Sequence, residues 1–500
     1  MGDASTVLTE REAIQLFRRS GFGFRRRDVE RVLARGETRG EVVDRLLGRR
    51  PGRFRPSGAT IDRVHDSWVK YMLRTRRQAQ EKMVLFLHDH FATSADTVDE
   101  PRWMAKQNQL FRIHSTGNFR DLVRAVNRDP AMMEFLDTVR NKKAEPNENY
   151  AREFLELFTL GVADLQGQPT YEQEDIVQIA RAFTGWRVDD RGKAYLRTGQ
   201  HDFQADYPER GPKVVFRNHG GFGPQGRDFT VNGEGEAEID TVVDIVFEHR
   251  DSEGKNTVAR HLVRKLLDFY AFVDPDPGRR KLVVDEIVAA SAFDTTWDLG
   301  GLLRTIFVHD VFYETCKPFG EAVAKSVIWP VDYVVGTMRT LGMRLRGRDA
   351  YVDGGSYGLV RDHLANMGQV LFAPPSVFGW DWETAWLNSG TLLARYAFAR
   401  DLAAARKRPH GSARGRTAFR PEKLLDTSRI GTPVRDIAEE MLAVLGRTDD
   451  FTDTEKTTLA SYLGDGNPNG TLDLTDENVR LTKLHGLLSL VLQAPASLFH

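Results

Sequence analysis

The chain has 500 residues, a length at which two helical lobes and one elaborated domain are both common. Its 70 lysines and arginines nearly cancel its 71 aspartates and glutamates, so the formal net charge is −1. A protein that binds nucleic acid or an anionic membrane usually carries a clear basic excess, and nucleic acid is therefore not an expected partner. Cys316 is the only cysteine, which excludes an intrachain disulfide.

The start of the chain has the pattern of an amphipathic helix, a turn and a second helix. It lacks the basic and then apolar segments of a secretion signal. The longest apolar stretches, such as residues 487–492, are too short to span a bilayer. We therefore expect a cytoplasmic protein without a membrane span.

Helical periodicity dominates the N-terminal third. Val64, Trp68 and Met72 recur at i, i+4 and i+8, which places them on one apolar helical face. Residues 82–91 are apolar nearly all round, so this segment is predicted to be a buried helix. Further helices are predicted over residues 118–126, 147–160 and 170–183.

The composition changes between about residues 187 and 235, where nine glycines accumulate. Residues 213–217 and 228–231 have the pattern of short strands, so we expect a small β-hairpin insertion here. Helical patterning then returns over residues 239–247, 257–272, 282–292, 299–308, 322–341, 357–367, 389–405 and 481–492.

These patterns predict a mostly α fold, a multi-helical globular body with a small β-hairpin insertion around residues 187–235. A basic segment rich in Gly, Pro and Ser is expected to be a solvated loop. The predicted parts are an N-terminal helical lobe (1–186), the Gly-rich insertion (187–235), a second helical lobe with a Trp-rich loop (236–405), the basic loop (406–425) and a C-terminal helical segment (426–500).

The first candidate site is the sequence His88-Asp89-His90 at the end of the predicted buried helix. On a regular helix His90 shares the face of the apolar residues before it, and His88 points roughly the opposite way. One interpretation is structural, because each imidazole bonds a neighbour and a cationic histidine suits a helix C-terminus. The other makes His88 or His90 a catalytic proton carrier.

The second candidate lies in the helix predicted over residues 147–160. Asn149, Glu153 and Glu156 share one flank beside the apolar stripe, whereas Glu148 and Arg152 pair at i, i+4 on a wetter face. Two carboxylates one turn apart share a proton, hold a divalent cation or receive arginines. The functional interpretation makes Glu153 and Glu156 catalytic or cation-binding, with Asn149 and Arg152 as substrate contacts. The structural one is a salt-bridge network.

The third candidate is the Trp-rich stretch over residues 367–395, in which Pro374, Pro375 and Gly379 predict an irregular backbone. Indoles beside carboxylate and amide groups suit stacking on sugar rings, although such a loop also fills gaps between helices. Under the functional interpretation the substrate contacts are Gln369, Trp380, Trp386 and Asn388. Asn388 or Ser389 is in addition predicted to cap the following helix.

Common catalytic signatures are missing from the chain. It contains no P-loop, no H-E-x-x-H and no G-x-G-x-x-G that joins a strand to a helix. These absences argue against the most frequent nucleotide-binding and metalloprotease families.

Many long strings resemble the bacterial family called domain of unknown function 1800, and they cover most of residues 10–400 in the expected order. They are LFRRSGFG (16–23), KMVLFLHDHFATS (82–94), QNQLFRIHSTGNFRDLVRAVNRDPAMMEFLD (107–137), NENYAREFLELFTLG (147–161), ARAFTGW (180–186), VARHLVRKLLDFY (258–270), KSVIWPVDYVVGTMR (325–339), MGQVLFAPPSVFGW (367–380) and AWLNSGTLLAR (385–395).

The resemblance implies a mostly helical fold and a bacterial source. Genes of this family often neighbour those of a sulfatase-like family, domain of unknown function 1501, which implies a partner protein of that kind and a task in surface or polysaccharide biology. Two features depart from the family. Its members commonly carry His-Asp-x-Gly-x-Lys, whereas His201-Asp202 and Gly211-x-Lys213 are separated here. Many relatives also carry an export signal.

Two functions remain open from the sequence. The first is an enzyme of hydrolase or lyase type that acts on a glycan or a similar polar polymer, with the three candidate motifs around one cavity. The second is a non-catalytic helical scaffold that binds a sulfatase-like partner, in which the polar motifs are internal ion-pair networks.

Overall fold

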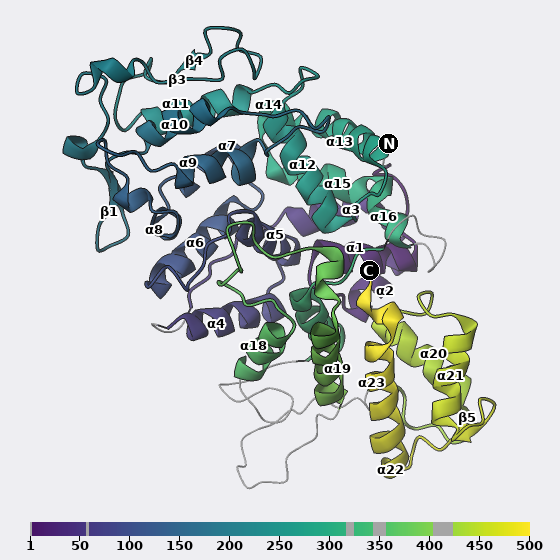
Figure 1. Cartoon of the computed structure of the whole chain (residues 1–500). Coiled ribbons are helices and arrows are strands. Elements are labelled where there is room, and N and C mark those ends of the chain that lie inside the picture. Colours follow the sequence, from purple (N-terminus) through teal and green to yellow (C-terminus); the bar gives the residue numbers. More distant parts are fainter. Residues whose placement is uncertain (1–2, 57–59, 317–324, 344–356, 404–423) are drawn as a thin grey trace.

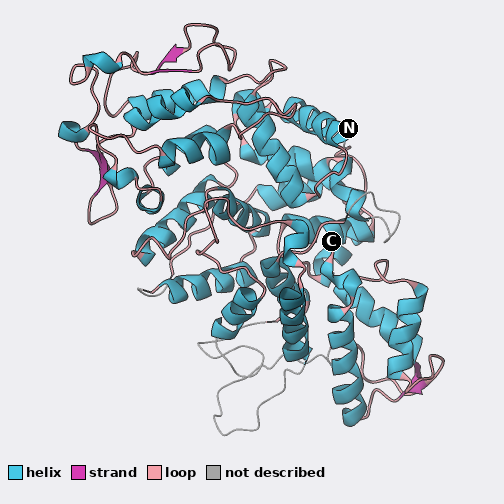
Figure 2. Ribbon diagram, viewed as in Figure 1, coloured by secondary structure: helices cyan, strands magenta, loops and turns pink. Residues whose placement is uncertain are grey.

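The structure is a computed structural model that describes residues 3–56, 60–316, 325–343, 357–403 and 424–500 (Figure 1). Helices make up most of it, and the few strands form small two-stranded pairs at the edge of the view in Figure 2. The prediction of a mostly α fold with a small β insertion is confirmed.

The N-terminal part is built from helices packed around one buried helix, α5 (Gln78–His90). Its residues from Ala79 to His90 are all buried, as the absence of a polar face predicts. The helices around it are α1 (Glu10–Ser20), α2 (Arg26–Arg35), α3 (Arg39–Leu47), α4 (Ile61–Arg74), α6 (Pro101–His114), α7 (Phe119–Val126), α8 (Pro130–Phe135), α9 (Asn149–Glu153) and α10 (Gln173–Ala182).

The predicted β insertion contains two hairpins. Strand β1 (Trp186–Val188) pairs with β2 (Ala194–Leu196). Strand β3 (Val214–Val215) pairs with β4 (Arg227–Asp228), close to the two strands that the sequence predicts. A third antiparallel pair, β5 (Thr432–Pro433) with β6 (Thr471–Leu472), lies near the C-terminus.

The second half is again helical. Helix α12 packs against α13, and α15 packs against α3. The helices are α11 (Glu238–Glu248), α12 (Thr257–Tyr270), α13 (Pro277–Ser291), α14 (Phe293–Thr296), α15 (Leu299–Val308), α16 (Asp310–Tyr313), α17 (Thr337–Thr340), α18 (Tyr357–Asn366) and α19 (Ser389–Ala403).

The C-terminal segment forms a compact helical group, drawn in yellow in Figure 1. Helix α23 packs against α19, and α20 packs against α21. The four helices are α20 (Val434–Leu445), α21 (Asp453–Leu463), α22 (Glu477–Val479) and α23 (His485–Gln493).

Several predicted helices are less regular than their patterns suggest. The helix expected over residues 147–160 is α9 followed by a π-helical turn, Phe154–Thr159. The segment expected to be helical over residues 322–341 contains a second π-turn, Asp332–Gly336, before α17, and its first residues lie outside the described chain. Most of the predicted basic loop, 406–425, also lies outside the described residues.

A buried arginine joins the two halves of the molecule. Arg19, at the end of α1, donates hydrogen bonds to the carbonyls of Phe269, Tyr270 and Ala271 at 2.8, 2.7 and 2.8 Å. These carbonyls end α12 and have no acceptor role inside that helix, so the guanidinium caps it. Among the helices that the structure describes, none combines the length and the apolar character needed to cross a bilayer.

Candidate functional site

The end of α5 is the point at which the three sequence motifs meet. His88, Asp89 and His90 are each at most 3% exposed, because the apolar helix carries them into the core. They contact three different neighbours: the backbone at Phe372, the backbone at Trp380 and the carbonyl of Phe158.

His88 is a neutral hydrogen-bond acceptor. Its Nε2 accepts a hydrogen bond from the backbone N–H of Phe372 at 3.0 Å. The imidazole also makes edge contacts with Trp68 and Trp380, with ring centroids 5.3 and 5.4 Å apart. Burial lowers the pKa of His88 to about 3. The geometry supports the structural interpretation of this residue.

His90 points to the π-helical turn. Its Nε2 lies 3.2 Å from the carbonyl oxygen of Phe158. A carbonyl only accepts, so this nitrogen carries the ring hydrogen. The other ring nitrogen, Nδ1, is buried and has no hydrogen-bond partner in the structure. Burial holds the pKa of His90 well below its ordinary value, and the charge of Lys265 adds to the effect.

Asp89 links α5 to the Trp-rich loop. Its Oδ1 accepts a hydrogen bond from the backbone N–H of Trp380 at 2.8 Å. Burial raises the pKa of Asp89 to about 7, although the charge of Lys265 and hydrogen bonds from Trp380 and Trp382 act in the opposite direction. The carboxyl group therefore changes its charge near neutral pH.

Helix α12 presents a polar stripe toward this junction. His261, Arg264, Lys265 and Asp268 follow one another at i, i+3, i+4 and i+7, which places them on one helical face. The residues between them, from Leu262 onward, are buried apolar side chains. Because these titratable groups are partly removed from water, they need polar neighbours on their side of the helix.

Lys265 is the most unusual residue of the stripe. It is half-buried, and within the described part of the chain its amino group forms no hydrogen bond and no ion pair. Burial lowers the pKa of Lys265 to about 8, while the charge of Asp89 works against this shift. With a pKa of about 8, about one tenth of this amine is uncharged at pH 7, far more than for an ordinary lysine.

His261 and Asp268 flank Lys265 by one turn on either side. Burial, followed by the charges of Arg264 and Lys265, holds the pKa of His261 well below its ordinary value. Burial raises the pKa of Asp268 to about 6, although it pairs with Arg280. We call Asp89, His90, His261, Lys265 and Asp268 the polar seam.

The carboxyl pair formed by Glu153, the last residue of α9, and Glu156, in the π-helical turn, lies in a separate polar cluster. Glu156 accepts a hydrogen bond from the hydroxyl of Tyr171 and lies 3.4 Å from Arg152, whose other contacts are Glu148 and Gln173. Glu156 is therefore held by an ion pair and a phenol, as the salt-bridge interpretation predicts.

Glu153 differs from Glu156 in its environment. Burial, together with the neighbouring charge of Glu156, raises the pKa of the half-buried Glu153. Two carboxyls with different environments are the arrangement that acid–base catalysis uses. Asn149 is exposed, and the contacts of the pair leave the cation proposal without support: among the described residues no three His, Cys, Asp or Glu side chains gather as metal ligands would.

The Trp-rich loop is packed into the protein. Trp380 and Trp386 are 3% and 4% exposed, so neither indole offers a face to a ligand. Gln369 is buried, and its Oε1 accepts a hydrogen bond from the N–H of Val331 at 2.9 Å. Asn388 caps α19 through a 3.0 Å hydrogen bond from the N–H of Thr391, as predicted from the sequence.

Trp382, which the sequence analysis did not single out, is the half-buried indole of this loop. Its ring packs edge-on against Trp329 and Phe269, with centroids 5.3 and 6.1 Å apart. It also donates toward Asp89 and therefore borders the polar seam. The sequence signal for the seam was the polar stripe of α12, but nothing local indicates which segment covers that stripe.

His201 and Lys213, which are separated in the sequence, lie close together in the structure. Both bind Glu238, with His201 Nε2 at 3.2 Å and Lys213 Nζ at 2.7 Å from its Oε1. Asp202 receives Arg181 and Arg210 at 3.1 and 2.7 Å. The side chains of His201, Asp202, Lys213 and Glu238 have no exposed surface, so this network serves the fold.

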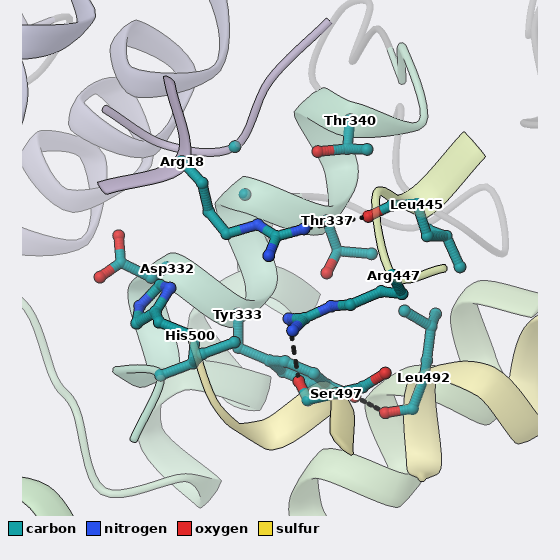
Figure 3. A pocket seen from close by; sticks show the side chains of 13 residues that line it. Arg18, Asp332, Tyr333, Thr337, Thr340, Leu445, Arg447, Leu492, Ser497 and His500 are labelled. Atoms are coloured by element: carbon teal, nitrogen blue, oxygen red, sulfur yellow. Dashed lines mark hydrogen bonds between the residues drawn. The ribbon is translucent and has the colours of Figure 1, made fainter. Parts of the chain in front are cut away.

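A cavity of about 510 Å³, part of it open to solvent, lies between α1, α17 and the C-terminal segment (Figure 3). Arg18 and Arg447 reach into it, but both donate to backbone carbonyls, at Gly446 (2.9 Å) and Phe499 (2.7 Å). Asp332 pairs with Lys82. None of the residues predicted from the sequence lines this cavity.

Fold and site together define a helical protein in which the end of α5, helix α12 and the Trp-rich loop border a half-buried polar seam. A family model described as a protein of unknown function (DUF1800) matches residues 15–497. The chain therefore belongs to this family, as its strings suggest. No curated protein and no solved structure matches it.

Proposed function

We propose that the protein is an enzyme and that the polar seam is its reaction centre, with Lys265 as the proton acceptor. The observation that carries the proposal is the half-buried amino group of Lys265, which has no hydrogen bond or ion pair among the described residues. A buried cation without a partner is costly in a folded protein, and such groups mark functional sites.

The chemistry of the seam fits proton transfer near neutral pH. Burial displaces two pKa values toward neutrality: that of the Lys265 amine to about 8 and that of the Asp89 carboxyl to about 7. A base whose pKa lies close to the working pH is the most efficient one, and general base catalysis contributes about 10²- to 10⁴-fold in rate. Lys265 accepts the proton, and the carboxylate of Asp89 beside it stabilises the positive charge that results.

The surroundings of the seam favour a polar substrate such as a glycan. Arg264 borders Lys265 and is partly exposed, and the half-buried Trp382 supplies an aromatic edge. In an elimination, Lys265 removes the C–H proton beside a carboxylate of the glycan, and Arg264 stabilises the negative charge that develops there. The carbon–carbon double bond forms as the bond to the glycosidic oxygen breaks, and this oxygen takes its proton from the lysine or from water. The lyase form of the hypothesis is therefore better supported than the hydrolase form.

The reactivity of Lys265 tests the first half of this proposal without a known substrate. Full-length protein is acylated briefly with acetic anhydride at a series of pH values, and the lysines are quantified by peptide mass spectrometry. We expect Lys265 to reach half of its limiting reaction rate near pH 8. Exposed Lys70 is the internal reference, and an identical pH profile for both lysines would remove the basis of the proposal.

Activity on a panel of neutral and acidic glycans tests the second half. A lyase product carries a new carbon–carbon double bond, which is detected by its ultraviolet absorbance. Lys265→Met is expected to lower the rate by about 10²-fold or more, whereas the matched Lys70→Met variant keeps it.

Glu153→Gln is assayed alongside these variants. Loss of activity in Glu153→Gln with full activity in Lys265→Met would move the reaction centre to the carboxyl pair of Glu153 and Glu156. Absence of turnover on every glycan, together with an ordinary Lys265 profile, would favour the scaffold hypothesis.

A further inference from the structure

A second feature, a cleft lined by arginines, lies at the other end of α5. It holds about 1190 Å³ of space, part of it open to solvent, and its walls come from α1, α2, the end of α3, the turn between α4 and α5, and α17. Gln78, the first residue of α5, borders it, whereas the polar seam begins at Asp89. At 1.5 Å per residue the two ends of this helix are roughly 18 Å apart.

The cleft concentrates positive charge. Seven arginines and a single aspartate line it, and it has no lysine, glutamate or histidine, so the formal charge of its wall is +6. The whole chain carries −1. Five of the arginines come from α2 and α3 with their flanking turns: Arg25, Arg27, Arg31, Arg45 and Arg49.

Part of this charge is not balanced by the protein. Arg45 is held by Glu37 through two 2.7 Å hydrogen bonds, and Arg31 lies 3.4 Å from Asp28. In contrast, the exposed side chain of Arg27 forms no ion pair within the described residues.

The exposed side chains of Arg49 and Arg76 likewise form no ion pair in the described part of the chain. Like charges that face one another across a concave surface repel, and a bound anion relieves this repulsion.

The floor of the cleft is a fixed guanidinium group. Arg339, on α17, is 7% exposed. Its Nε donates to the carbonyl of Phe22 at 2.7 Å and its Nη1 to the carbonyl of Leu73 at 2.8 Å. No carboxylate of the described chain forms an ion pair with it. These bonds orient the group before any ligand arrives, which reduces the entropy lost on binding.

We infer that this cleft binds a ligand with several phosphate groups in a row. All its cations are arginines, whose planar fork bonds phosphate oxygens in pairs, and a wall of +6 requires several negative charges in one ligand. The cleft is large enough for a small molecule. The near-neutral total charge of the chain argues against a nucleic acid strand as the ligand.

Calorimetric titration of the full-length protein with inorganic tripolyphosphate tests this inference. We expect binding whose affinity falls when the salt is raised from about 50 mM to about 200 mM. The Arg27→Gln/Arg76→Gln double variant removes two exposed guanidinium groups and is expected to weaken binding at least tenfold, the effect of about one charged hydrogen bond.

The matched control is Arg63→Gln/Arg191→Gln, which removes the same charge from exposed arginines outside the cleft. This variant should bind within about twofold of the wild type, since distant surface charges are screened. Equal weakening in both double variants, or no wild-type binding at the lower salt, would overturn the inference. So would tighter binding of duplex DNA than of tripolyphosphate.

A parallel titration with ATP separates two sources of the same chemistry. Equal affinity for ATP and tripolyphosphate identifies an inorganic oligophosphate site, and tighter binding of ATP identifies a nucleotide site lined by Phe17 and Leu46. The Lys265→Met variant should bind tripolyphosphate like the wild type, which keeps this result independent of the proposed reaction.

Discussion

Gly379 is the residue that allows the Trp-rich loop to approach Asp89. Its φ is +83°, and a Cβ atom there would contact the carboxylate of Asp89 and lie 2.8 Å from the backbone oxygen of the same residue. Only glycine fits this position, because both the backbone conformation and the space exclude a side chain. The loop and the end of α5 thus pack directly against each other because Gly379 has no side chain.

Gly379→Ala is expected to destabilise the protein by clearly more than the left-handed conformation alone. The matched control is Gly167→Ala, where φ is +79° and no atom lies within 4 Å of the added Cβ. The control should lose about 1–2 kcal/mol from backbone strain, and Gly379→Ala at least twice as much. Urea denaturation monitored by circular dichroism measures both. Equal losses in the free energy of unfolding would show that the loop shifts away from Asp89 at little cost.

His88→Leu is expected to lower the free energy of unfolding by about 1–3 kcal/mol, because the buried N–H of Phe372 then has no acceptor. The folded variant should keep the glycan lyase activity of the wild type, since His88 holds the backbone of Phe372 and takes no part in proton transfer. His114→Leu, a change at a half-buried histidine, is the control. A stable variant without activity would instead restore His88 as a catalytic residue.

Asp89→Asn is expected to change how stability depends on pH. The folded pKa of about 7 lies above the value of 3.8 for an unperturbed carboxyl. The folded state therefore binds more protons between these values, and the contribution of Asp89 is fully present below 3.8 and is lost as the pH rises through 7.

Relative to wild type, Asp89→Asn should therefore gain stability between about pH 4 and about pH 7, by at most about 4 kcal/mol. Urea denaturation at several pH values measures the difference. Asp96→Asn, at an exposed site, provides the reference. A difference between Asp89→Asn and wild type that stays constant over this range would contradict the assigned shift.

Glu238→Gln is expected to destabilise the protein by about 3–5 kcal/mol, because the buried ammonium of Lys213 loses the carboxylate to which it is hydrogen-bonded and keeps only Glu234, 3.9 Å away. The exposed pair Arg227 and Glu248, 3.0 Å apart, provides the comparison. Glu248→Gln should change stability by less than about 1 kcal/mol. Thermal unfolding of both variants checks this, and similar losses would show that water reaches the buried network.

The helices and the β insertion could be predicted because their signals are local. The all-apolar run before His88 indicated a buried helix, and the short apolar run from Val214 indicated a strand. The π-turn at Phe154–Thr159 could not be foreseen, since its residues fit an ordinary helical pattern. Its extra residue per turn is decided by packing.

The candidate site was predictable in part. The motif around Asp89 was recognised, but its histidines and the indole of Trp380 are sealed contacts, whereas Lys265 lay within a string that looked like an ordinary amphipathic helix. Its importance depends on what covers α12, and that is a tertiary property.

The cap that Arg19 places on the end of α12 has a consequence for synthesis. Its three acceptors come 250 to 252 residues later in the chain. At a synthesis rate of about 5–20 residues per second this is a delay of roughly 10–50 s, during which the first helix has left the ribosome without the groups that its guanidinium needs. The nascent N-terminal half must stay unaggregated over that time.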